Sequence, residues 1–174
     1  MSYFAAAAVR DSTGWSAEEV DLSGVGDVDE VADRLRDVDQ DADISLLFVE
    51  ADDAYLVILR LDEGEDLRIF GSDSAFADES RLGELLIGDL KAPVVEVEEP
   101  ARGAAQPGEE ESEAPLVDPD ADPVGDADLL ADLGVSAQRL LTLSAMEGML
   151  PADVTAEVCQ KIGCGDVVEE LREA

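Results

Sequence analysis

The feature that most constrains this chain is an acidic, proline-rich stretch in the middle of the sequence. Six of the seven prolines fall between Ala92 and Val124, among Glu, Ala, Gly and Asp residues. Such a composition offers too little apolar surface to offset the entropy of ordering it, and like charges keep it extended. We therefore expect an α+β sheet domain over residues 1–91, a disordered acidic linker over 92–125 and a small helical segment over 126–174.

Before the linker, the hydrophobic pattern changes its period several times. The runs "SYFAAAAVR" and "GWSAEEVDL" predict two strands joined by the turn residues of "DSTG", and "ISLLFVEA", "AYLVILRLD" and "DLRIFGS" predict a three-strand meander. Both alternate sets of side chains in "AYLVILRLD" are largely apolar, so we expect this strand to be central in the sheet, with both faces covered. A helix is predicted between the first two strands and the meander, and Asp27 with Glu30 forms a capping box at its start. One face of this helix is apolar: Val28, Val31, Leu35 and Val38. A Leu-rich helix in "SRLGELLIGDL" completes a mainly antiparallel fold of order β-β-α-β-β-β-α.

The residues after the linker predict four short helices. Gly134 ends the first helix and Ser136 caps the second. Pro151 opens the third, and Asp166 with Glu169 forms a capping box for the fourth. A piece of about 45 residues with few aromatic side chains is near the lower size limit for folding alone. We therefore expect it to dock on the sheet domain or on a partner.

Acidic residues outnumber basic ones throughout the chain. The net charge is -33, with 24 acidic and 7 basic residues in 1–95, and 9 and 3 in 127–174. A surface of this sign repels a phosphate backbone, so direct nucleic-acid binding is the function that the charge disfavours most. Two causes of the acidity stay open: adaptation to high salt, or recognition of a basic partner, whose association a complementary potential accelerates.

The sequence does not predict a metal site. The chain has no His, and its two thiols, Cys159 and Cys164, lack the second pair of ligands that a tetrahedral zinc site requires. The carboxylates of "DPDADPVGDAD" alternate as in a calcium loop, but Leu129 or Ala131 stands where either register needs the closing Glu. We expect Cys159 to be buried and Cys164 to be more exposed, and a redox role for the pair stays open.

Nor does the sequence predict a catalytic or cofactor site. Gly24 and Gly26 follow a strand and precede a helix, as in a dinucleotide loop, but the third glycine is absent and Asp27 would face the pyrophosphate. Four adjacent pairs of carboxylates fall in strand edges or turns: Glu18 with Glu19, Asp52 with Asp53, Asp62 with Glu63, and Glu65 with Asp66. An acid–base pair needs two carboxyl groups in different environments, and solvation makes these environments alike. We expect no catalytic, cofactor-binding or metal-binding residue, and no enzyme activity.

The chain also has no apolar run that approaches the ~20 residues needed to span a bilayer. Its opening "MSYFAAAAVR" has no basic leader. We therefore expect a soluble cytoplasmic protein.

Two stretches resemble a known family. "MSYFAAAAVRDSTGWSAEEVDL" leading to "ISLLFVEADDAYLVILRL", and "DLLADLGVSAQRLLTLSAMEGMLPADVTAEVCQKIGC", are similar to the tRNA adenosine deaminase-associated proteins. The resemblance implies an accessory role in tRNA modification. Zinc deaminases hold their metal with His-x-Glu and Pro-Cys-x-x-Cys motifs, which this chain lacks, so the resemblance assigns no catalytic residue.

Two functions follow as hypotheses. The first is a non-catalytic accessory protein that binds the tRNA adenosine deaminase or another basic protein through its acidic surface. Binding that salt does not weaken would instead indicate an apolar groove around Leu140, Met146, Met149 and Leu150. The alternative is a small-ligand or enzyme domain whose sheet lines a pocket with Trp15 and Tyr55, although core packing is the favoured explanation of both aromatic residues.

Overall fold

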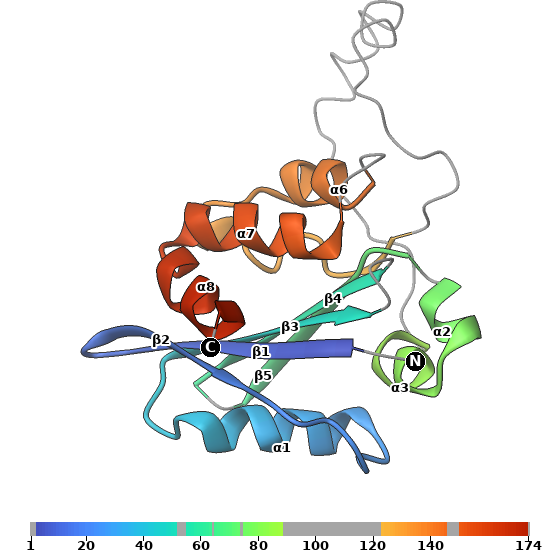
Figure 1. Ribbon diagram of the computed structural model, residues 1–174, viewed down its shortest axis with the longest axis horizontal. Coiled ribbons are helices and arrows are strands. Elements are labelled where there is room, and N and C mark those ends of the chain that lie inside the picture. The colour runs from blue at the N-terminus through green and yellow to red at the C-terminus, as the bar shows by residue number, and fades with distance from the viewer. Residues whose placement is uncertain are drawn as a thin grey trace, which may run out of the picture.

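The chain forms three layers, with an antiparallel sheet between two layers of helices (Figure 1). The computed structural model describes residues 3–51, 55–63, 65–73, 75–88, 123–145 and 150–173. Within these residues the six strands are β1 (Tyr3–Asp11), β2 (Gly14–Glu19), β3 (Ile44–Ala51), β4 (Tyr55–Asp62), β5 (Asp66–Gly71) and β6 (Val124–Gly125), in the spatial order β2-β1-β3-β4-β5-β6. The helices are α1 (Val28–Val38), α2 (Ala75–Glu79), α3 (Arg81–Ile87), the 3-10 turn η1 (Ala131–Leu133), α6 (Ala137–Ala145), α7 (Pro151–Ile162) and α8 (Gly165–Glu173).

The predicted α+β class is confirmed, and each of the elements predicted before residue 88 is present. Local chemistry explains two of the boundaries. Asp11 accepts hydrogen bonds from the backbone N–H and the hydroxyl of Thr13, at 2.8 and 2.6 Å, which forms the turn between β1 and β2. Asp27 caps α1 as expected, because its Oδ1 accepts from the Glu30 backbone N–H at 3.0 Å. The short helix α2 was not predicted.

One face of the sheet carries α1 together with α2 and α3. Val31 and Leu35 of α1 are fully buried against it, as are Phe76 of α2 and Ile87 of α3. Strand β4 contributes one alternate set of side chains to this face: Tyr55, Val57, Leu59 and Leu61. Its other alternate set faces the opposite way, which confirms the expectation that β4 is central and covered on both sides.

The opposite face of the sheet is covered by the segment after residue 126. Phe48, Ile58 and Phe70 of the sheet share a buried cluster with Leu129 and Leu140 and with residues of α7 and α8. Figure 1 shows α6, α7 and α8 on the side of the sheet away from α1. The helical segment therefore docks on the sheet, one of the two arrangements that its small size predicted.

The helix boundaries in the C-terminal segment mostly follow the sequence signals. Gly134 ends η1 with a φ of 115°, and the Ser136 hydroxyl accepts from the Arg139 backbone N–H at 3.1 Å to cap α6. Pro151 opens α7. The last helix differs, because it begins at Gly165 and Asp166 lies inside its first turn. Residues 92–122 of the predicted linker lie outside the described part of the chain. The last two residues of the linker, Val124 and Gly125, form a strand, β6, which pairs with β5.

Candidate functional site

The two cysteines do not form an exposed reactive site. Cys159 in α7 is 0% exposed and Cys164 is 1% exposed, and neither is in a disulfide. The expectation for Cys159 is confirmed, whereas the greater exposure expected for Cys164 is wrong. Cys164 N–H donates to the carbonyl of Cys159 at 2.9 Å, so the turn after α7 folds the second thiol back under α8. Both thiols are part of the core between sheet and helices.

The acidic residues do not converge on a metal site in the part of the chain that the structure describes. No three carboxylates or thiols there come close enough together to hold an ion. The start of the calcium-like stretch, Asp118 to Asp122, and the pair Asp52 with Asp53 lie outside that part. Asp62 serves a structural contact, since it accepts from Arg60 at 2.9 Å and from Arg68 at 3.2 Å.

The two aromatic residues proposed to share a pocket lie on opposite faces of the sheet. Trp15 packs with the cluster under α7 and α8, and the Arg10 guanidinium carbon lies 5.7 Å from its ring centroid. Tyr55 packs on the other face, where its ring stacks on Phe76 with centroids 5.1 Å apart. A pocket that contains both is therefore excluded, and core packing explains both side chains. The proposed groove is not assembled by the described residues either, since Leu140 is buried, Leu150 is 47% exposed, and Met146 and Met149 lie outside them.

A buried arginine joins the C-terminal segment to the sheet. Arg60 of β4 is 4% exposed and donates to the Leu129 carbonyl at 2.6 Å. Its guanidinium also forms a bidentate ion pair with the Asp132 carboxylate, with N–O distances of 2.6 and 2.9 Å. These hydrogen bonds lower the pKa of Asp132 and raise that of Arg60. We call this arrangement of Arg60, Leu129 and Asp132 the Arg60 clamp.

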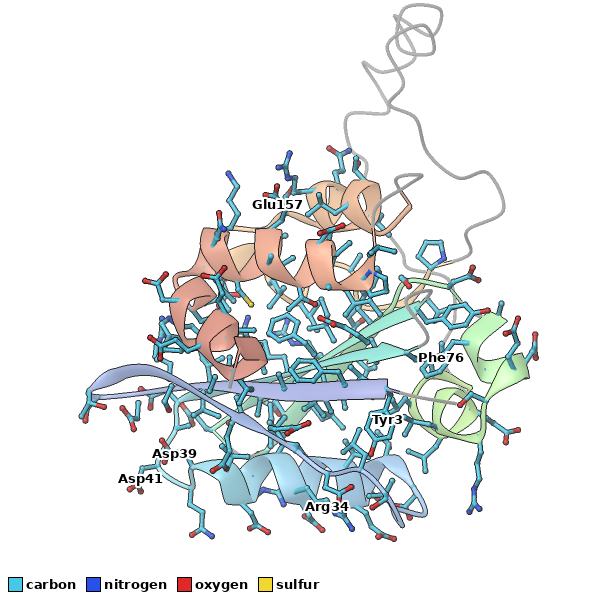
Figure 2. All side chains as sticks on the ribbon, viewed as in Figure 1. Tyr3, Arg34, Asp39, Asp41, Phe76 and Glu157 are labelled. Carbon is cyan, nitrogen blue, oxygen red and sulfur yellow. The ribbon has the colours of Figure 1, made fainter. Side chains whose placement is uncertain are left out.

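Carboxylates crowd at one end of the molecule, where the β1–β2 turn meets the end of α1. Asp39 accepts from the Asp41 backbone N–H at 2.9 Å, which lowers its pKa. The side-chain hydrogen bond with Asp11, desolvation, and the charges of Asp11 and Asp41 together outweigh that effect, so the pKa of Asp39 is raised. Figure 2 shows Asp39 and Asp41 near one another below the hairpin. We call Asp11, Asp39 and Asp41 the hairpin carboxylates.

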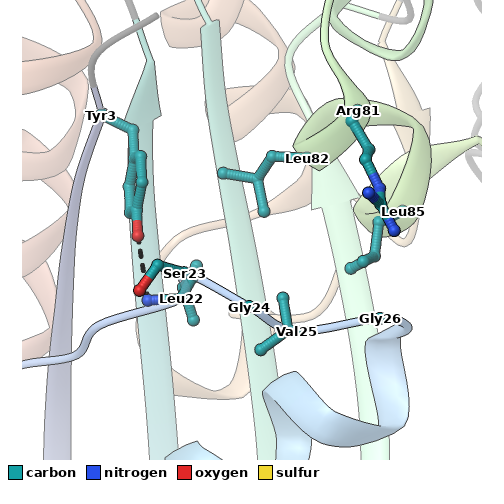
Figure 3. A pocket seen from close by; sticks show the side chains of 9 residues that line it. All are labelled: Tyr3, Leu22, Ser23, Gly24, Val25, Gly26, Arg81, Leu82 and Leu85. Carbon is teal, nitrogen blue, oxygen red and sulfur yellow. Dashed lines mark hydrogen bonds between the residues drawn. The ribbon is translucent and has the colours of Figure 1, made fainter.

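A cavity of about 330 Å³ opens at the other end of α1 (Figure 3). It lies between Tyr3 of β1, the loop 22–26 that leads into α1, and Arg81, Leu82 and Leu85 of α3. The Leu22 backbone N–H donates to the Tyr3 hydroxyl at 2.9 Å, which fixes one wall. We call it the Tyr3 cavity. The sequence did not predict this site, because nearly eighty residues separate Tyr3 from α3 and no local pattern connects them.

The family follows from comparison with known proteins. A family model described as Rv3753c-like tRNA adenosine deaminase-associated protein matches residues 3–165. The chain belongs to this family. The match begins with β1 and ends where α8 begins, so the Rv3753c-like family unit includes both the sheet and the helical layer that docks on it.

Further comparisons add no relatives to the Rv3753c-like family match. No curated protein and no solved structure matches the chain. Among the residues described, none of the helices is both long and apolar enough to cross a membrane.

Proposed function

We propose that this protein is a non-catalytic accessory factor that binds a tRNA adenosine deaminase in the cytoplasm through its acidic surface. The family description, which names the association with that enzyme, is the observation that carries the proposal. The net charge of -33 supports the mode of binding. A deaminase that acts on tRNA has to present basic groups to phosphates, and an acidic protein can occupy the same surface.

The place we propose for this contact is the outer side of α1 together with the hairpin carboxylates. Asp29, Asp33 and Asp37 are exposed along α1, on the side away from its buried residues. The hairpin carboxylates continue this acidic surface, where the side-chain hydrogen bond with Asp11, desolvation and the charges of Asp11 and Asp41 raise the pKa of Asp39. A Lys or Arg side chain of a partner placed there would relieve the repulsion, so a basic partner is favoured over a neutral one.

The test is to measure the affinity of the purified protein for the tRNA adenosine deaminase of the same organism over a range of salt. Between about 0.1 M and about 1 M NaCl the Debye length falls from about 10 to about 3 Å. We expect the Kd to rise by about tenfold or more over this range, because exposed charges are screened. A complex that forms with unchanged affinity at high salt would contradict the charge-driven mode, and no binding at low salt would contradict the proposed function.

Two matched triple variants locate the contact. The first is D29N/D33N/D37N on α1, and the control is E157Q/E169Q/E170Q, which removes the same number of exposed acidic residues from α7 and α8. We expect the first to weaken binding and to flatten its salt dependence, and the control to leave both nearly unchanged. Equal effects of the two variants would mean that net charge, and not the α1 surface, determines the affinity.

A further inference from the structure

The Tyr3 cavity has a charge opposite to that of the protein as a whole. Arg81 is the one ionisable side chain, apart from the phenol of Tyr3, among the residues that line it. In the described part of the chain no carboxylate pairs with Arg81, although the protein has 44 acidic residues. The other described arginines before residue 89 each have a partner: Arg10, Arg34, Arg36, Arg60 and Arg68. An unpaired cation beside an apolar wall is suited to an anionic ligand.

The loop beneath the cavity contributes further hydrogen-bond donors. The backbone N–H groups of Gly24 and Gly26 have no acceptor among the described residues. The carbonyl of Ser23 accepts from Arg34 at 3.1 Å, on the α1 side of the loop. Because the peptide bond between Ser23 and Gly24 is trans, the Gly24 N–H points away from Arg34. The donors on this loop therefore remain free for a ligand.

The cavity is held in shape without a ligand. Arg34 also donates to the carbonyl of Asp21, and the Ser23 backbone N–H donates to the Asp21 carboxylate at 2.9 Å. Leu22, which lies between these two residues, donates its backbone N–H to the Tyr3 hydroxyl (Figure 3). A loop held at several points loses little entropy when a ligand binds, which favours binding to a preformed pocket.

We infer that the Tyr3 cavity binds a small amphipathic anion, with its apolar body against Tyr3, Leu82 and Leu85 and a carboxylate or phosphate head at Arg81. The volume of about 330 Å³ is at the lower end of the range of ligand pockets, which is about 300–1,000 Å³, so the ligand is small. A dinucleotide is excluded because it is too large for a cavity of this volume. This site does not depend on the proposed binding of the deaminase.

The experiment is a titration of the full chain, labelled with ¹⁵N, with four ligands of the same alkyl length: hexanoate, hexyl phosphate, hexanol and hexylammonium. We expect the two anions to shift the amide resonances of Gly24 and Gly26 in a saturable way, and hexanol to bind more weakly. We expect no saturable shift of these resonances by hexylammonium, because Arg81 repels it. The comparison of hexanoate with hexyl phosphate then decides which head group the site prefers.

Two variants, each of which replaces a different arginine with Gln, provide a test and its matched control. Arg81→Gln should raise the Kd for the preferred anion by about fivefold, as expected for the loss of one charge-assisted hydrogen bond at a partly solvated site. Arg139→Gln removes another exposed and unpaired arginine of the described chain, on the far layer, and should leave the Kd unchanged. Leu85→Trp should block the cavity and abolish the shifts, while the spectrum elsewhere stays that of the folded protein.

Three results would overturn the inference. The first is equal binding of hexylammonium and hexanoate, and the second is an equal loss of affinity in Arg81→Gln and Arg139→Gln. The third is that neither anion shifts Gly24 or Gly26 at millimolar concentration, or that the shifts map to another part of the chain.

Discussion

The Arg60 clamp predicts how firmly the C-terminal segment is attached to the sheet. The variant Arg60→Met keeps most of the apolar stem and removes every donor of the guanidinium. Leu129 is 0% exposed, so its carbonyl would lose its donor in a dry site, at a cost of about 1–3 kcal/mol. Asp132 is 61% exposed and would be rehydrated, so the ion pair itself contributes about 1 kcal/mol or less. We therefore expect the free energy of unfolding to fall by about 3 kcal/mol.

Urea unfolding followed by Trp15 fluorescence is the assay, because Trp15 packs in the core that the C-terminal helices cover. The variant Asp132→Asn tests the ion pair alone and should cost about 1 kcal/mol. The control is Arg68→Gln, which removes an arginine that is 35% exposed and contacts Asp62 at 3.2 Å. We expect this control to cost less than about 0.5 kcal/mol.

The pH dependence of the same assay identifies the charge on Asp132. Its pKa is lowered by the hydrogen bonds from Arg60, so its contribution to stability is present above the ordinary value of 3.8. That contribution is lost as the pH falls through the lowered pKa. The stability difference between the wild type and Asp132→Asn should thus be constant near neutral pH and disappear in acid.

The reasoning is refuted if Arg60→Met unfolds at the same urea concentration as Arg68→Gln. In that case the Arg60 clamp would contribute no more to stability than an exposed ion pair, and apolar packing alone would hold the helical layer on the sheet. A difference between wild type and Asp132→Asn that persists in strong acid would refute the assignment of the charge.

Three further predictions concern single positions. A Cβ on Gly83 would lie 2.1 Å from the Phe76 carbonyl oxygen, so Gly83→Ala should cost about 3 kcal/mol in urea unfolding, because backbone must move. Asp27→Ala removes the cap of α1 and should cost about 1 kcal/mol in the same measurement. The thiols of Cys159 and Cys164 should react with a thiol reagent only as fast as the protein unfolds, because both are buried.

Matched controls distinguish these effects from general sensitivity. Gly26→Ala brings a Cβ to 3.3 Å from the movable end of Glu30, so it should cost far less than Gly83→Ala. Asp29→Ala removes an acidic residue from the first turn of α1 without removing the cap and should cost less than Asp27→Ala. Thiol reaction that is faster than unfolding would contradict the buried position of α7.

The sequence predicted most of the sheet because period and turn chemistry are local signals. The two apolar sides of β4 indicated a central strand, and Asp27 and Gly134 marked helix boundaries where the structure has them. Burial of Cys164 was missed, since flanking glycines suggested exposure, whereas the bond from its N–H to the Cys159 carbonyl turns it inward.

The candidate sites could not be predicted in the same way. Tyr3 and Arg81 line the same cavity only because the fold places the start of β1 and α3 around it, and sequence spacing does not encode that proximity. Arg60 read as one residue of an apolar strand, and its role depends on the return of Leu129 and Asp132 to the opposite face of the sheet. The proposed pocket with both Trp15 and Tyr55 was wrong because successive residues of a strand point to opposite faces of the sheet, and these two side chains lie on different faces.

Strand β6 brings the chain back to the sheet, so the segment before residue 89 and the segment after residue 122 share one core. Residues 89–122 connect α3 to β6, and both of these elements already belong to the same body. Because Ile87 and Val124 lie in the same buried cluster, the core itself holds the two sides of this connection in place. Evolution can therefore rewrite the connection without altering the core. An engineer could insert a reporter there, or express the two parts as separate chains and ask whether they reassemble.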